Sequence, residues 1–395
     1  MTKPDKKLKP GGKVWRFDQI ATNVNERIDK PSESGLEYYV GLEHLDPDSL
    51  KIRRWGSPDD VEATKLIFRK GDVIFGRRRA YQRKLGVAEF DGICSAHAMV
   101  LRAKPEVVLP EFLPFFLQSD AFMERAIKIS VGSLSPTVNW KTLAVQEFVL
   151  PPQPRQIHVC EAMRAIDTVI EALKDAAQKR MKIRASLAVL VFTDASEHAL
   201  ICCKELIDSG HLTLQTGPFG TVLKASAYKE KGHAIINPVH MKDGKLDVVS
   251  GPFVSEADWL RLEKYWMREG DMVMGRKGDM SNLIYVGSEY DQLIVGSDCI
   301  RFRVNSKRIN PRYFYHFLRS EVTHNWIQGQ AYGTVMPGIN EKILGRLVTC
   351  CPDLAEQKDC ANQFDSIETT LQQITERSMK LMQVRGNLLH SVLGD

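Results

Sequence analysis

Residues 110–156, PEFLPFFLQSDAFMERAIKISVGSLSPTVNWKTLAVQEFVLPPQPRQ, align without a gap with residues 311–357, PRYFYHFLRSEVTHNWIQGQAYGTVMPGINEKILGRLVTCCPDLAEQ. At this shift of 201, the identical pairs include Pro110 and Pro311, Leu117 and Leu318, Ser119 and Ser320, Gly132 and Gly333, Pro136 and Pro337, Asn139 and Asn340, Lys141 and Lys342, Leu143 and Leu344, Pro151 and Pro352, and Gln156 and Gln357. A period near 200 residues indicates a duplicated domain, because solenoid repeats are only about 20 to 50 residues long.

The duplication continues upstream of this stretch. KGDVIFGRR (70–78) matches EGDMVMGRK (269–277), and YYVGLEHL (38–45) matches AIINPVHM (234–241) more weakly. Two copies of one domain make a chain with pseudo-twofold symmetry. Such symmetry suits a target with two sites at a fixed separation, as in duplex DNA.

Each copy has the same order of expected elements, which predicts the α+β fold class. Short apolar runs broken by Gly and Asp predict strands at the start of each copy. The elements that follow are an aromatic helix over 110–128 or 310–328, a Gly/Ser/Pro loop over 132–139 or 333–340, and a short strand ending at Pro151 or Pro352.

A long helix is expected at the end of each copy, from 156 to about 192 and from 356 to about 393, since both stretches lack Pro and are rich in helix formers. An apolar stripe with 4,3 spacing runs along each: Ile166, Ile170, Leu173, Ala177, Arg180, Arg184 and Leu187, and Ile367, Leu371, Ile374, Ser378, Leu381, Arg385 and Leu388. This spacing places one apolar stripe on each helix, as in a coiled coil. A length of about 35 residues, or about 50 Å at 1.5 Å per residue, exceeds what one domain needs and favours mutual packing over separate packing of each helix on its own domain. Arg184 and Arg385 interrupt the stripes, either as residues that specify the seam or because the helix drifts out of phase there.

The chain is therefore expected to contain a first domain, a central helix, a second domain and a C-terminal helix, with bounds 1–155, 156–195, 196–355 and 356–395.

Composition restricts the class of protein. A hydrophobic share of 43% with 26% charged residues is typical of soluble globular proteins, and no run of about 18 apolar residues predicts a membrane span. The basic N-terminus, MTKPDKKLKPGGK, has no apolar region behind it, so we expect a tail rather than a secretory signal and a cytoplasmic protein. The eight cysteines form no CxxC pair, which favours reduced thiols over a zinc site. A net charge of +5 permits a polyanionic partner without requiring one.

The doubled pattern resembles the specificity subunits of type I restriction-modification systems over nearly the whole chain. The residues that carry the resemblance are the two GD-x-(V/I)-x-G-R stretches, the two G-(S/T)-x-x-P-x-x-N loops, TGPFGTVLKASAY (216–228), and the helix starts LPPQPRQ (150–156) and CPDLAEQ (351–357). The family commonly has a Pro-Pro-x-x-Glu-Gln turn into each helix. Here Arg155 stands at the Glu position and Asp353 replaces the second Pro.

The resemblance implies two target-recognition domains, each followed by a long helix, with the two helices packed as an antiparallel coiled coil. Each domain would read one half of a bipartite, gapped DNA site, and the helices would fix the gap. Two adenine methyltransferase subunits would dock on the domains and helices, and restriction/translocase subunits would join for cleavage. S-adenosylmethionine, ATP and Mg would belong to those partners, with no cofactor expected on this chain.

The candidate DNA-binding residues of the first copy lie in RRRAYQRK (77–84). This segment contains Arg77, Arg78, Arg79, Tyr81, Gln82, Arg83 and Lys84. Arg and Lys neutralise phosphates, and Arg and Gln side chains can also grip guanine and adenine. The equivalent segment RKGDMSN (276–282) keeps Arg276 and Lys277 and then diverges, as expected of two readers of different half-sites. A solvated basic loop is the alternative interpretation.

The Gly/Ser/Pro loops supply a second set of candidates for phosphate contacts, namely Ser133, Asn139, Thr334 and Asn340. Turn chemistry is their alternative role, because Ser, Thr and Asn side chains bond to nearby backbone. His44 and His240 are expected to be structural residues at strand ends.

The motifs of the relevant enzymes are missing or misplaced in the sequence. The one Pro-Pro, in Leu-Pro-Pro-Gln (150–153), is not the loop of an amino-methyltransferase, and no P-loop is present. Pro352-Asp353 followed by Glu356 and Lys358 mimics a nuclease metal site, but acidic residues at a helix start have an ordinary electrostatic explanation. We therefore expect a non-catalytic, DNA-reading chain. The rival is a two-domain protein-binding adaptor with a helical stalk.

Overall fold

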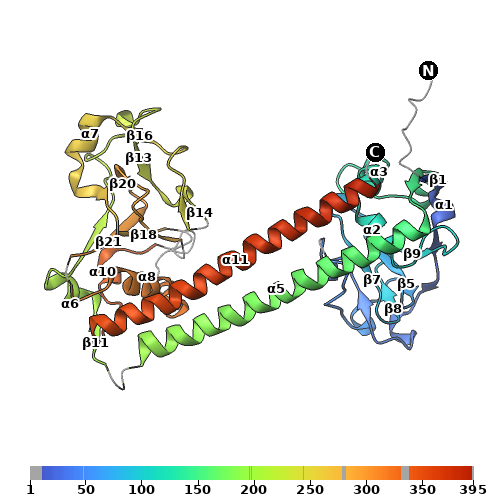
Figure 1. Cartoon of the computed structure of the whole chain (residues 1–395), viewed down its shortest axis with the longest axis horizontal. Coiled ribbons are helices and arrows are strands. Elements are labelled where there is room, and N and C mark those ends of the chain that lie inside the picture. Colours follow the sequence, from blue (N-terminus) through green and yellow to red (C-terminus); the bar gives the residue numbers. More distant parts are fainter. Residues whose placement is uncertain are drawn as a thin grey trace. The chain divides into compact units, whose positions relative to one another are not determined.

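The computed structural model of the chain describes residues 11–47, 49–194, 196, 198–242, 244–277, 282–305, 307–330 and 338–393. The chain divides into two compact units: unit 1 contains Met1–Lys174 and Thr375–Asp395, and unit 2 contains Asp175–Ile374. Two long helices, α5 (Gln153–Thr193) and α11 (Leu354–Leu393), each contribute residues to both units (Figure 1).

Unit 1 contains two four-stranded sheets and a separate strand pair. The first sheet has the order β2 (Ala21–Val24), β9 (Met99–Ala103), β6 (Val73–Phe75) and β7 (Leu85–Val87), all antiparallel. The second has the order β3 (Arg27–Ile28), β5 (Lys65–Phe68), β8 (Gly92–Cys94) and β4 (Tyr39–Val40). The separate pair is β1 (Lys13–Arg16) with β10 (Glu147–Leu150).

Unit 2 contains strands in a closely similar order. Its first sheet is β12 (Leu212–Thr216), β21 (Cys299–Val304), β18 (Met272–Gly275) and β19 (Leu283–Tyr285). Its second is β16 (Phe253–Val254), β13 (His233–Ile236), β20 (Leu293–Val295) and β17 (Trp266–Met267). Two further pairs are β11 (Leu200–Cys202) with β22 (Val348–Cys350), and β14 (Met241–Lys242) with β15 (Lys245–Leu246).

The second sheets of the two units share a three-strand arrangement. In unit 1, β8 lies antiparallel to β5 and parallel to β4. In unit 2, β20 lies antiparallel to β17 and parallel to β13. The units differ in the extra edge strand, which is β3 beside β5 in unit 1 and β16 beside β13 in unit 2.

The first sheet of each unit lies between two apolar cores, because successive side chains of a strand point to opposite faces. In β6, Val73 and Phe75 pack into one core and Ile74 into the other. In β18, Met272 and Met274 pack into one core and Val273 into the other. The strand inside each GD-x-x-x-G motif is therefore buried on both faces.

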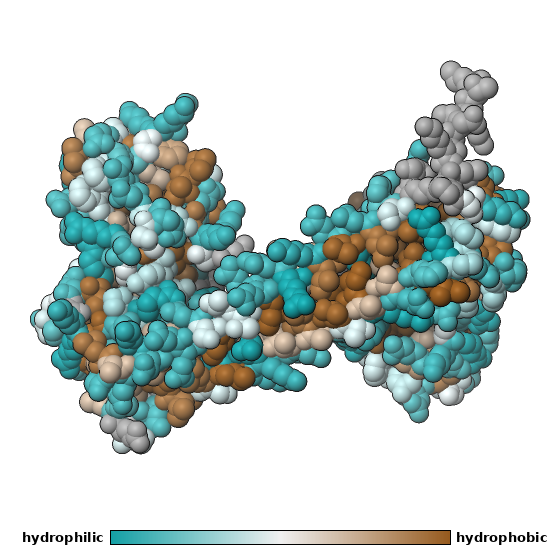
Figure 2. All heavy atoms as spheres, viewed as in Figure 1, coloured by the Kyte–Doolittle hydropathy of each residue, from teal (hydrophilic) through white to brown (hydrophobic). Residues whose placement is uncertain are grey.

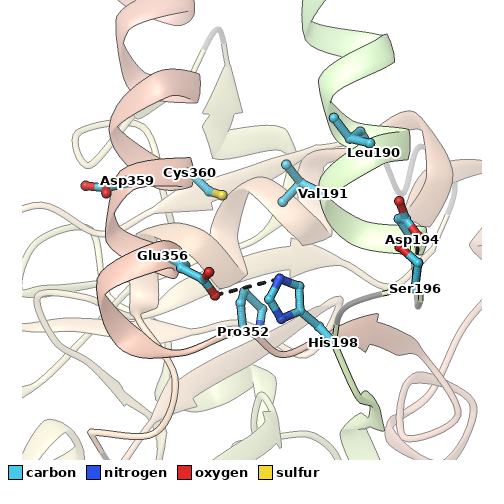
Figure 3. A pocket seen from close by; sticks show the side chains of 9 residues that line it. All are labelled: Leu190, Val191, Asp194, Ser196, His198, Pro352, Glu356, Asp359 and Cys360. Atoms are coloured by element: carbon cyan, nitrogen blue, oxygen red, sulfur yellow. Dashed lines mark hydrogen bonds and ion pairs between the residues drawn. The ribbon is translucent and has the colours of Figure 1, made fainter.

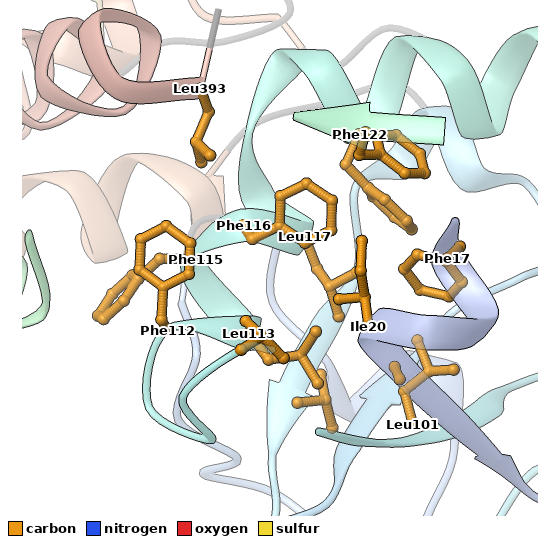
Figure 4. Packing of buried hydrophobic residues seen from close by; sticks show 14 of the residues in the cluster. Phe17, Ile20, Leu101, Phe112, Leu113, Phe115, Phe116, Leu117, Phe122 and Leu393 are labelled. Atoms are coloured by element: carbon orange, nitrogen blue, oxygen red, sulfur yellow. The ribbon is translucent and has the colours of Figure 1, made fainter. Parts of the chain in front are cut away.

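Helices complete the larger core of each unit. The short helices are α1 (Phe17–Ile20), α4 (Trp140–Ala144), α6 (Cys203–Asp208), α7 (Glu256–Arg261) and α10 (Glu341–Leu344). The 3-10 segments are Pro31–Glu33, Leu42–His44, Pro58–Asp60, Ala80–Gln82, Ala225–Ala227, Pro238–His240 and Glu263–Tyr265. In unit 1, the rings of Phe17, Phe116 and Phe122 gather in this core, and Leu393 of α11 belongs to the same cluster (Figure 4).

The expectation of one continuous aromatic helix in each copy was wrong. The structure has α2 (Leu113–Gln118) and α3 (Asp120–Lys128), and in the second copy α8 (Pro311–Arg319) and α9 (Glu321–Gln330). The breaks fall at Ser119 and Ser320, whose backbones are extended. The hydroxyl of Ser119 accepts from Phe122 N–H at 3.3 Å, and that of Ser320 from Thr323 N–H at 3.1 Å. Each serine thus caps a new helix.

The long helices begin within three residues of the predicted positions, and each is joined to its unit by a buried glutamine. The Gln156 side chain accepts from Leu109 N–H at 2.9 Å and donates to two backbone carbonyls. The Gln357 side chain accepts from Asn310 N–H at 2.8 Å and likewise donates to two backbone carbonyls. Because both side chains are fully buried, these bonds fix where each helix leaves its unit.

The helices contact each other within each unit. In unit 1, Val159 and Met163 near the start of α5 share a core with Leu389 and Val392 near the end of α11. In unit 2, Phe192 near the end of α5 stacks on Phe364 near the start of α11, with ring centroids 5.4 Å apart. Within the predicted stripes, every residue except Arg180 is at least partly buried.

The two arginines that interrupt the stripes make specific contacts. Arg385 pairs with Asp167 at 2.8 Å and also donates to the Gln118 carboxamide. Arg184 donates to the backbone carbonyl of Arg319 at 3.1 Å. Gln118 and Arg319 are the last residues of α2 and α8, so both arginines join a long helix to the aromatic helix of a unit. Of the helices in the described ranges, none combines the length and apolar content that a bilayer crossing requires.

Candidate nucleic-acid interface

The basic segment 77–84 forms a tight loop between β6 and β7. Arg79 and Arg83 have left-handed backbones, with φ of 58° and 54°, on either side of a 3-10 turn. Such a conformation costs about 1–2 kcal/mol for a residue other than Gly. Backbone hydrogen bonds hold this conformation: Arg79 N–H donates to the Pro136 carbonyl at 2.7 Å, and Val138 N–H donates to the Arg77 carbonyl at 2.9 Å.

Two of the predicted cations serve the fold of the unit itself. Arg83 pairs with Asp120 at 2.8 Å and donates to the Gln118 carbonyl at 2.7 Å. The Lys84 ammonium donates to the Leu42 carbonyl at 2.8 Å. These bonds direct both side chains back into unit 1, so they anchor the loop.

Two other arginines of the loop, Arg78 and Arg79, contact the Gly/Ser/Pro loop. Arg78 lies between His97 Nε2, at 3.2 Å, and Ser135 Oγ, at 3.3 Å, and Arg79 Nε also donates to Ser135 Oγ at 3.3 Å. Tyr81 is 52% exposed. The basic loop and the Gly/Ser/Pro loop, which are far apart in sequence, therefore form one polar and cationic surface.

The second set of candidate residues divides into two roles. Ser133 is exposed, and Asn139 is exposed with no bond from its side chain to the helix that follows. Asn340 instead caps α10 by accepting from Ile343 N–H at 2.9 Å, as the turn interpretation anticipates. Thr334 lies outside the described residues.

In unit 2, Arg276 and Lys277 have a backbone setting similar to that of Arg77 and Arg78. Ile339 N–H donates to the Arg276 carbonyl at 2.9 Å, as Val138 N–H does to Arg77. Lys277 pairs with Asp298 at 2.9 Å. The Nε atoms of Arg77 and Arg276 are both buried, and neither has a hydrogen-bond partner within the described parts of the chain. Equivalent arginines thus occupy equivalent places, whereas the residues beside them differ.

The Gly-Asp part of each motif is structural. Gly71 and Gly270 have φ of 92° and 86°, which suits the turn before each buried strand. The Asp72 carboxylate accepts two hydrogen bonds from the Arg102 guanidinium, at 2.7 and 2.8 Å. The Asp271 carboxylate accepts two from the Arg303 guanidinium, each at 2.7 Å. Each aspartate fixes the strand that presents the arginine of its loop.

Sequence reasoning missed His97 and Ser135, which contact the loop arginines. Burial lowers the pKa of His97, and the neighbouring positive charges of Arg78, Arg77 and Lys65 lower that pKa further. Ser135 lies within the Gly/Ser/Pro loop over 132–139, but no local signal connects it or His97 with Arg78. His44 and His240 are structural, as expected, because each accepts a backbone N–H at 3.0 Å through Nδ1.

The acidic residues at the start of α11 do not form the suspected nuclease site. Asp353 Oδ1 accepts from the N–H groups of Ala355 and Glu356, at 2.8 and 2.9 Å, and so caps the helix. Glu356 lines a cavity of about 430 Å³ in unit 2, where its carboxylate lies 3.7 Å from His198. Figure 3 shows Glu356 turned toward His198 and Asp359 turned away from it.

A second cluster in unit 2 has the composition of a metal site, but it is an ion-pair network. Ligand atoms of His316, Asp365 and Glu368 lie within 4.8 Å of one another. Arg312 pairs with Asp365, and Arg319 pairs with Glu368 at 2.5 Å. The carboxylates are thus already neutralised. Burial lowers the pKa of His316.

The sequence is similar to that of type I restriction enzyme specificity subunits. Residues 60–180 match the family model of the type I restriction modification DNA specificity domain. The chain is 23% identical over 190 residues to the EcoDI type I restriction enzyme specificity subunit of Escherichia coli, covering 46% of this chain and 42% of that subunit. The chain therefore spans less than half of the length of that relative. It is 21% identical over 321 residues to the MjaVIII specificity subunit of Methanocaldococcus jannaschii, covering 74% of this chain and 73% of that one.

Solved structures share the fold. The S subunit of a type I restriction-modification system from M. genitalium matches with a TM-score of 0.60 at 15% identity, over 100% of this chain and 98% of that one. A chain from a study of complex assembly and conformational transition in a type I system matches with a TM-score of 0.59 at 18% identity, over 99% of this chain and 100% of that one. Residues 60–180 thus match a type I restriction modification DNA specificity domain, the chain is similar in sequence to two type I specificity subunits, and it shares its α+β fold with the two solved structures.

Proposed function

We propose that this chain recognises a bipartite, gapped DNA site, with one half-site read by each unit from the major groove. The observation that carries the proposal is the doubled frame around Arg77 and Arg276, in which the same backbone bond holds each arginine at the end of a buried strand. The neighbouring side chains differ between the units, so each unit would read its own bases. Arginine is suited to this task because its guanidinium can grip guanine bidentately.

The long helices are proposed to act as an antiparallel coiled coil that spaces the two duplicated domains. Two facts support this role: each helix contributes residues to both units, and residues near opposite ends of the helices share a core in each unit. Removing seven residues from each helix, 172–178 and 372–378, shortens each by about 10 Å at 1.5 Å per residue. The gap in the recognised site is then expected to shrink by about three base pairs, at about 3.4 Å per pair. An unchanged gap would refute the spacer role.

Partner subunits are proposed to supply the chemistry. Two adenine methyltransferase subunits would bring S-adenosylmethionine, and restriction/translocase subunits would bring ATP and Mg. Apolar side chains are exposed on the stretches of α5 and α11 in each unit and offer docking sites for such partners; Figure 2 shows apolar surface on the two long helices in brown. In unit 1 these exposed residues include Ile157, Met379 and Val384, and in unit 2 Met181, Ile183 and Leu190. Exposed apolar groups in such numbers are typical of protein interfaces.

The primary test is to identify the site. The chain is co-expressed with its methyltransferase partner, and single-molecule sequencing maps methylated adenines in the host DNA. A single motif with two constant halves and a fixed gap supports the proposal. Absence of any new motif, in cells that contain the assembled complex, contradicts it.

Charge reversal separates DNA recognition from the rival role as a protein-binding adaptor. Substituting Glu at Arg77, Arg78 and Arg79 should abolish DNA binding, since it replaces three positive charges by negative ones next to phosphates. The partner subunits should still co-purify. An adaptor would keep its activity in the variant, and Arg69→Glu is the control, because Arg69 is an exposed arginine of unit 1 that already pairs with Glu26 and Asp91.

A further inference from the structure

Unit 1 contains a polar pocket of about 220 Å³ next to the basic loop. It is lined by side chains from several elements, among them Asn23 of β2, Asn25 and Arg27 at the start of β3, Lys65 of β5, Arg77 of the basic loop, and Trp140 of α4. Except for Arg77, none of these residues belongs to a segment that the sequence pattern singled out for DNA contact.

The pocket concentrates positive charge that no carboxylate neutralises. Among the described residues, Arg27, Lys65 and Arg77 form no ion pair: Arg27 donates to Asn25 Oδ1 at 3.2 Å, Lys65 to the Ala63 carbonyl at 2.5 Å, and Arg77 to the Ala96 carbonyl at 3.1 Å. Other arginines of unit 1 do have carboxylate partners, namely Arg53 with Glu171, Arg69 with Asp91, Arg83 with Asp120, and Arg102 with Asp72.

Two of the three cations, Lys65 and Arg77, are at least partly withdrawn from water, whereas Arg27 is exposed, so the cost of lacking a carboxylate partner falls on those two. Lys65 is only 7% exposed, and its burial lowers its pKa. The Arg77 Nε atom is buried and has no hydrogen-bond partner among the residues that the structure describes. Desolvated cations are stable only when they are paired or hydrogen-bonded. An anion entering the pocket would satisfy the Arg77 donor and lower the mutual repulsion of the three charges.

We propose that this pocket binds one backbone phosphate of the recognised DNA. The proposal rests on the DNA-reading function above and extends the interface from the loop to the second sheet of unit 1. Three cations line the space, and the Asn23 and Asn25 carboxamides can donate to the remaining phosphate oxygens, whereas the Thr64 hydroxyl already donates to Asp29 at 2.9 Å. A bound phosphate would fix the position of the DNA backbone relative to Arg78 and Arg79, because phosphate contacts set register and base contacts set specificity.

Unit 2 differs at the equivalent place. At the shift of 201, Glu341 stands where unit 1 has Trp140, and its carboxylate accepts from Thr216 N–H at 2.6 Å and Thr216 Oγ1 at 2.7 Å. Thr216 ends β12, the strand that corresponds to β2. A carboxylate at this position disfavours a phosphate, so the pocket is a property of unit 1 and its half-site.

The test uses the full-length chain with its partner subunits and measures DNA binding by fluorescence anisotropy at several salt concentrations. The variants are Arg27→Gln, Lys65→Gln and the double variant; Arg69→Gln is the control, because it removes the same charge from an arginine already paired with carboxylates. Each phosphate neutralised contributes about 0.9 to the slope of log affinity against log salt. Because both residues would hold one phosphate, the double variant should lower the slope by about 0.9 and not by about 1.8. The control should leave the slope unchanged.

A scan of single methylphosphonate linkages then locates the contact. In the wild-type complex, one neutral linkage should reduce affinity, and that loss should disappear in Arg27→Gln, an exposed position where folding is not at risk. Unchanged slopes in both single variants, or a changed preference for one base pair in place of a uniform loss, would overturn the pocket assignment while leaving the proposed function intact. Failure of the wild-type complex to bind DNA would instead refute the function itself.

Discussion

Replacing the buried glutamines of the long helices should destabilise the two units separately and to a similar extent. Gln156→Leu removes the hydrogen-bond partner of Leu109 N–H and of the carbonyls of Val107 and Pro151. These three groups lie 2.9, 3.2 and 2.9 Å from the Gln156 carboxamide. Gln357→Leu removes the partner of Asn310 N–H and of the carbonyls of Arg308 and Pro352, which lie 2.8, 3.1 and 2.8 Å from the Gln357 carboxamide. Because leucine has nearly the same size, lost polar contacts dominate over lost packing.

The magnitude follows from these contacts. An unsatisfied buried polar group costs about 1–3 kcal/mol. Each substitution leaves one N–H and two carbonyls without the glutamine, so the free energy of unfolding should fall by about 2–5 kcal/mol per glutamine. For units of about 200 residues, a loss of about 3 kcal/mol lowers Tm by about 6–12 °C. Thermal denaturation of the full chain measures the shift. Hydrogen exchange followed by mass spectrometry should show lost protection near 107–109 in one variant and near 308–310 in the other.

Exposed glutamines on the same helices provide matched controls. Gln178→Leu on α5 and Gln373→Leu on α11 make the same chemical change at solvent-exposed positions, where an effect within about 0.5 kcal/mol is expected. If the Gln156 and Gln357 variants were as stable as these controls, the view that each glutamine ties a long helix to its unit would be wrong.

Three further outcomes are expected. Asp271→Asn should lower the free energy of unfolding of unit 2 by about 3–5 kcal/mol in urea titrations, since it breaks a buried ion pair with Arg303; a change as small as at a surface site would contradict this. His97→Gln should reduce the loss of stability as the pH falls from about 7.5 to about 5.5. The pKa of His97 is lowered in the folded protein, so below the usual histidine pKa the unfolded chain binds a proton that the folded chain does not, and the free energy of unfolding decreases as the pH falls. Identical pH profiles of unfolding for the variant and the wild type would argue against this role. Arg385→Met should cost about 2–3 kcal/mol through loss of its bond to a carboxylate, whereas Arg184→Met, which removes a partly buried charge beside another arginine, should change stability by less than about 1 kcal/mol; comparable losses in urea unfolding would refute the distinction.

Sequence periodicity anticipated the order of elements better than their internal detail. The helix-start positions and the pairing of Gln156 with Gln357 followed from identity at one fixed shift. The breaks at Ser119 and Ser320 were missed even though both serines were recognised as equivalent, because the flanking residues favour helix and only the extended backbone of each serine separates two helices. Local propensity does not reveal such a cap when helix formers continue on both sides.

The candidate site was only partly accessible to sequence reasoning for a similar reason. The charge run identified the basic loop, but it did not separate Arg79, which lies on the exposed surface, from Arg83, which pairs with Asp120. The contacts of Arg78 with His97 and Ser135 join segments brought together by the sheet. Lys65 was missed because a single lysine within an apolar strand carries no pattern. Long-range contacts of this kind depend on the tertiary fold and leave no periodic signal.

The position of Leu389, Val392 and Leu393 within the core of unit 1 has a consequence for synthesis of the protein. Unit 1 lacks part of its interior until residues 375–393 leave the ribosome, about 200 residues after Lys174. At about 5–20 residues per second, the nascent unit waits about 10–40 seconds for its last layer, while all of unit 2 is made in the interval. The domain translated first is therefore the one completed last, and a ribosome that stops early releases a chain whose N-terminal half has an open core.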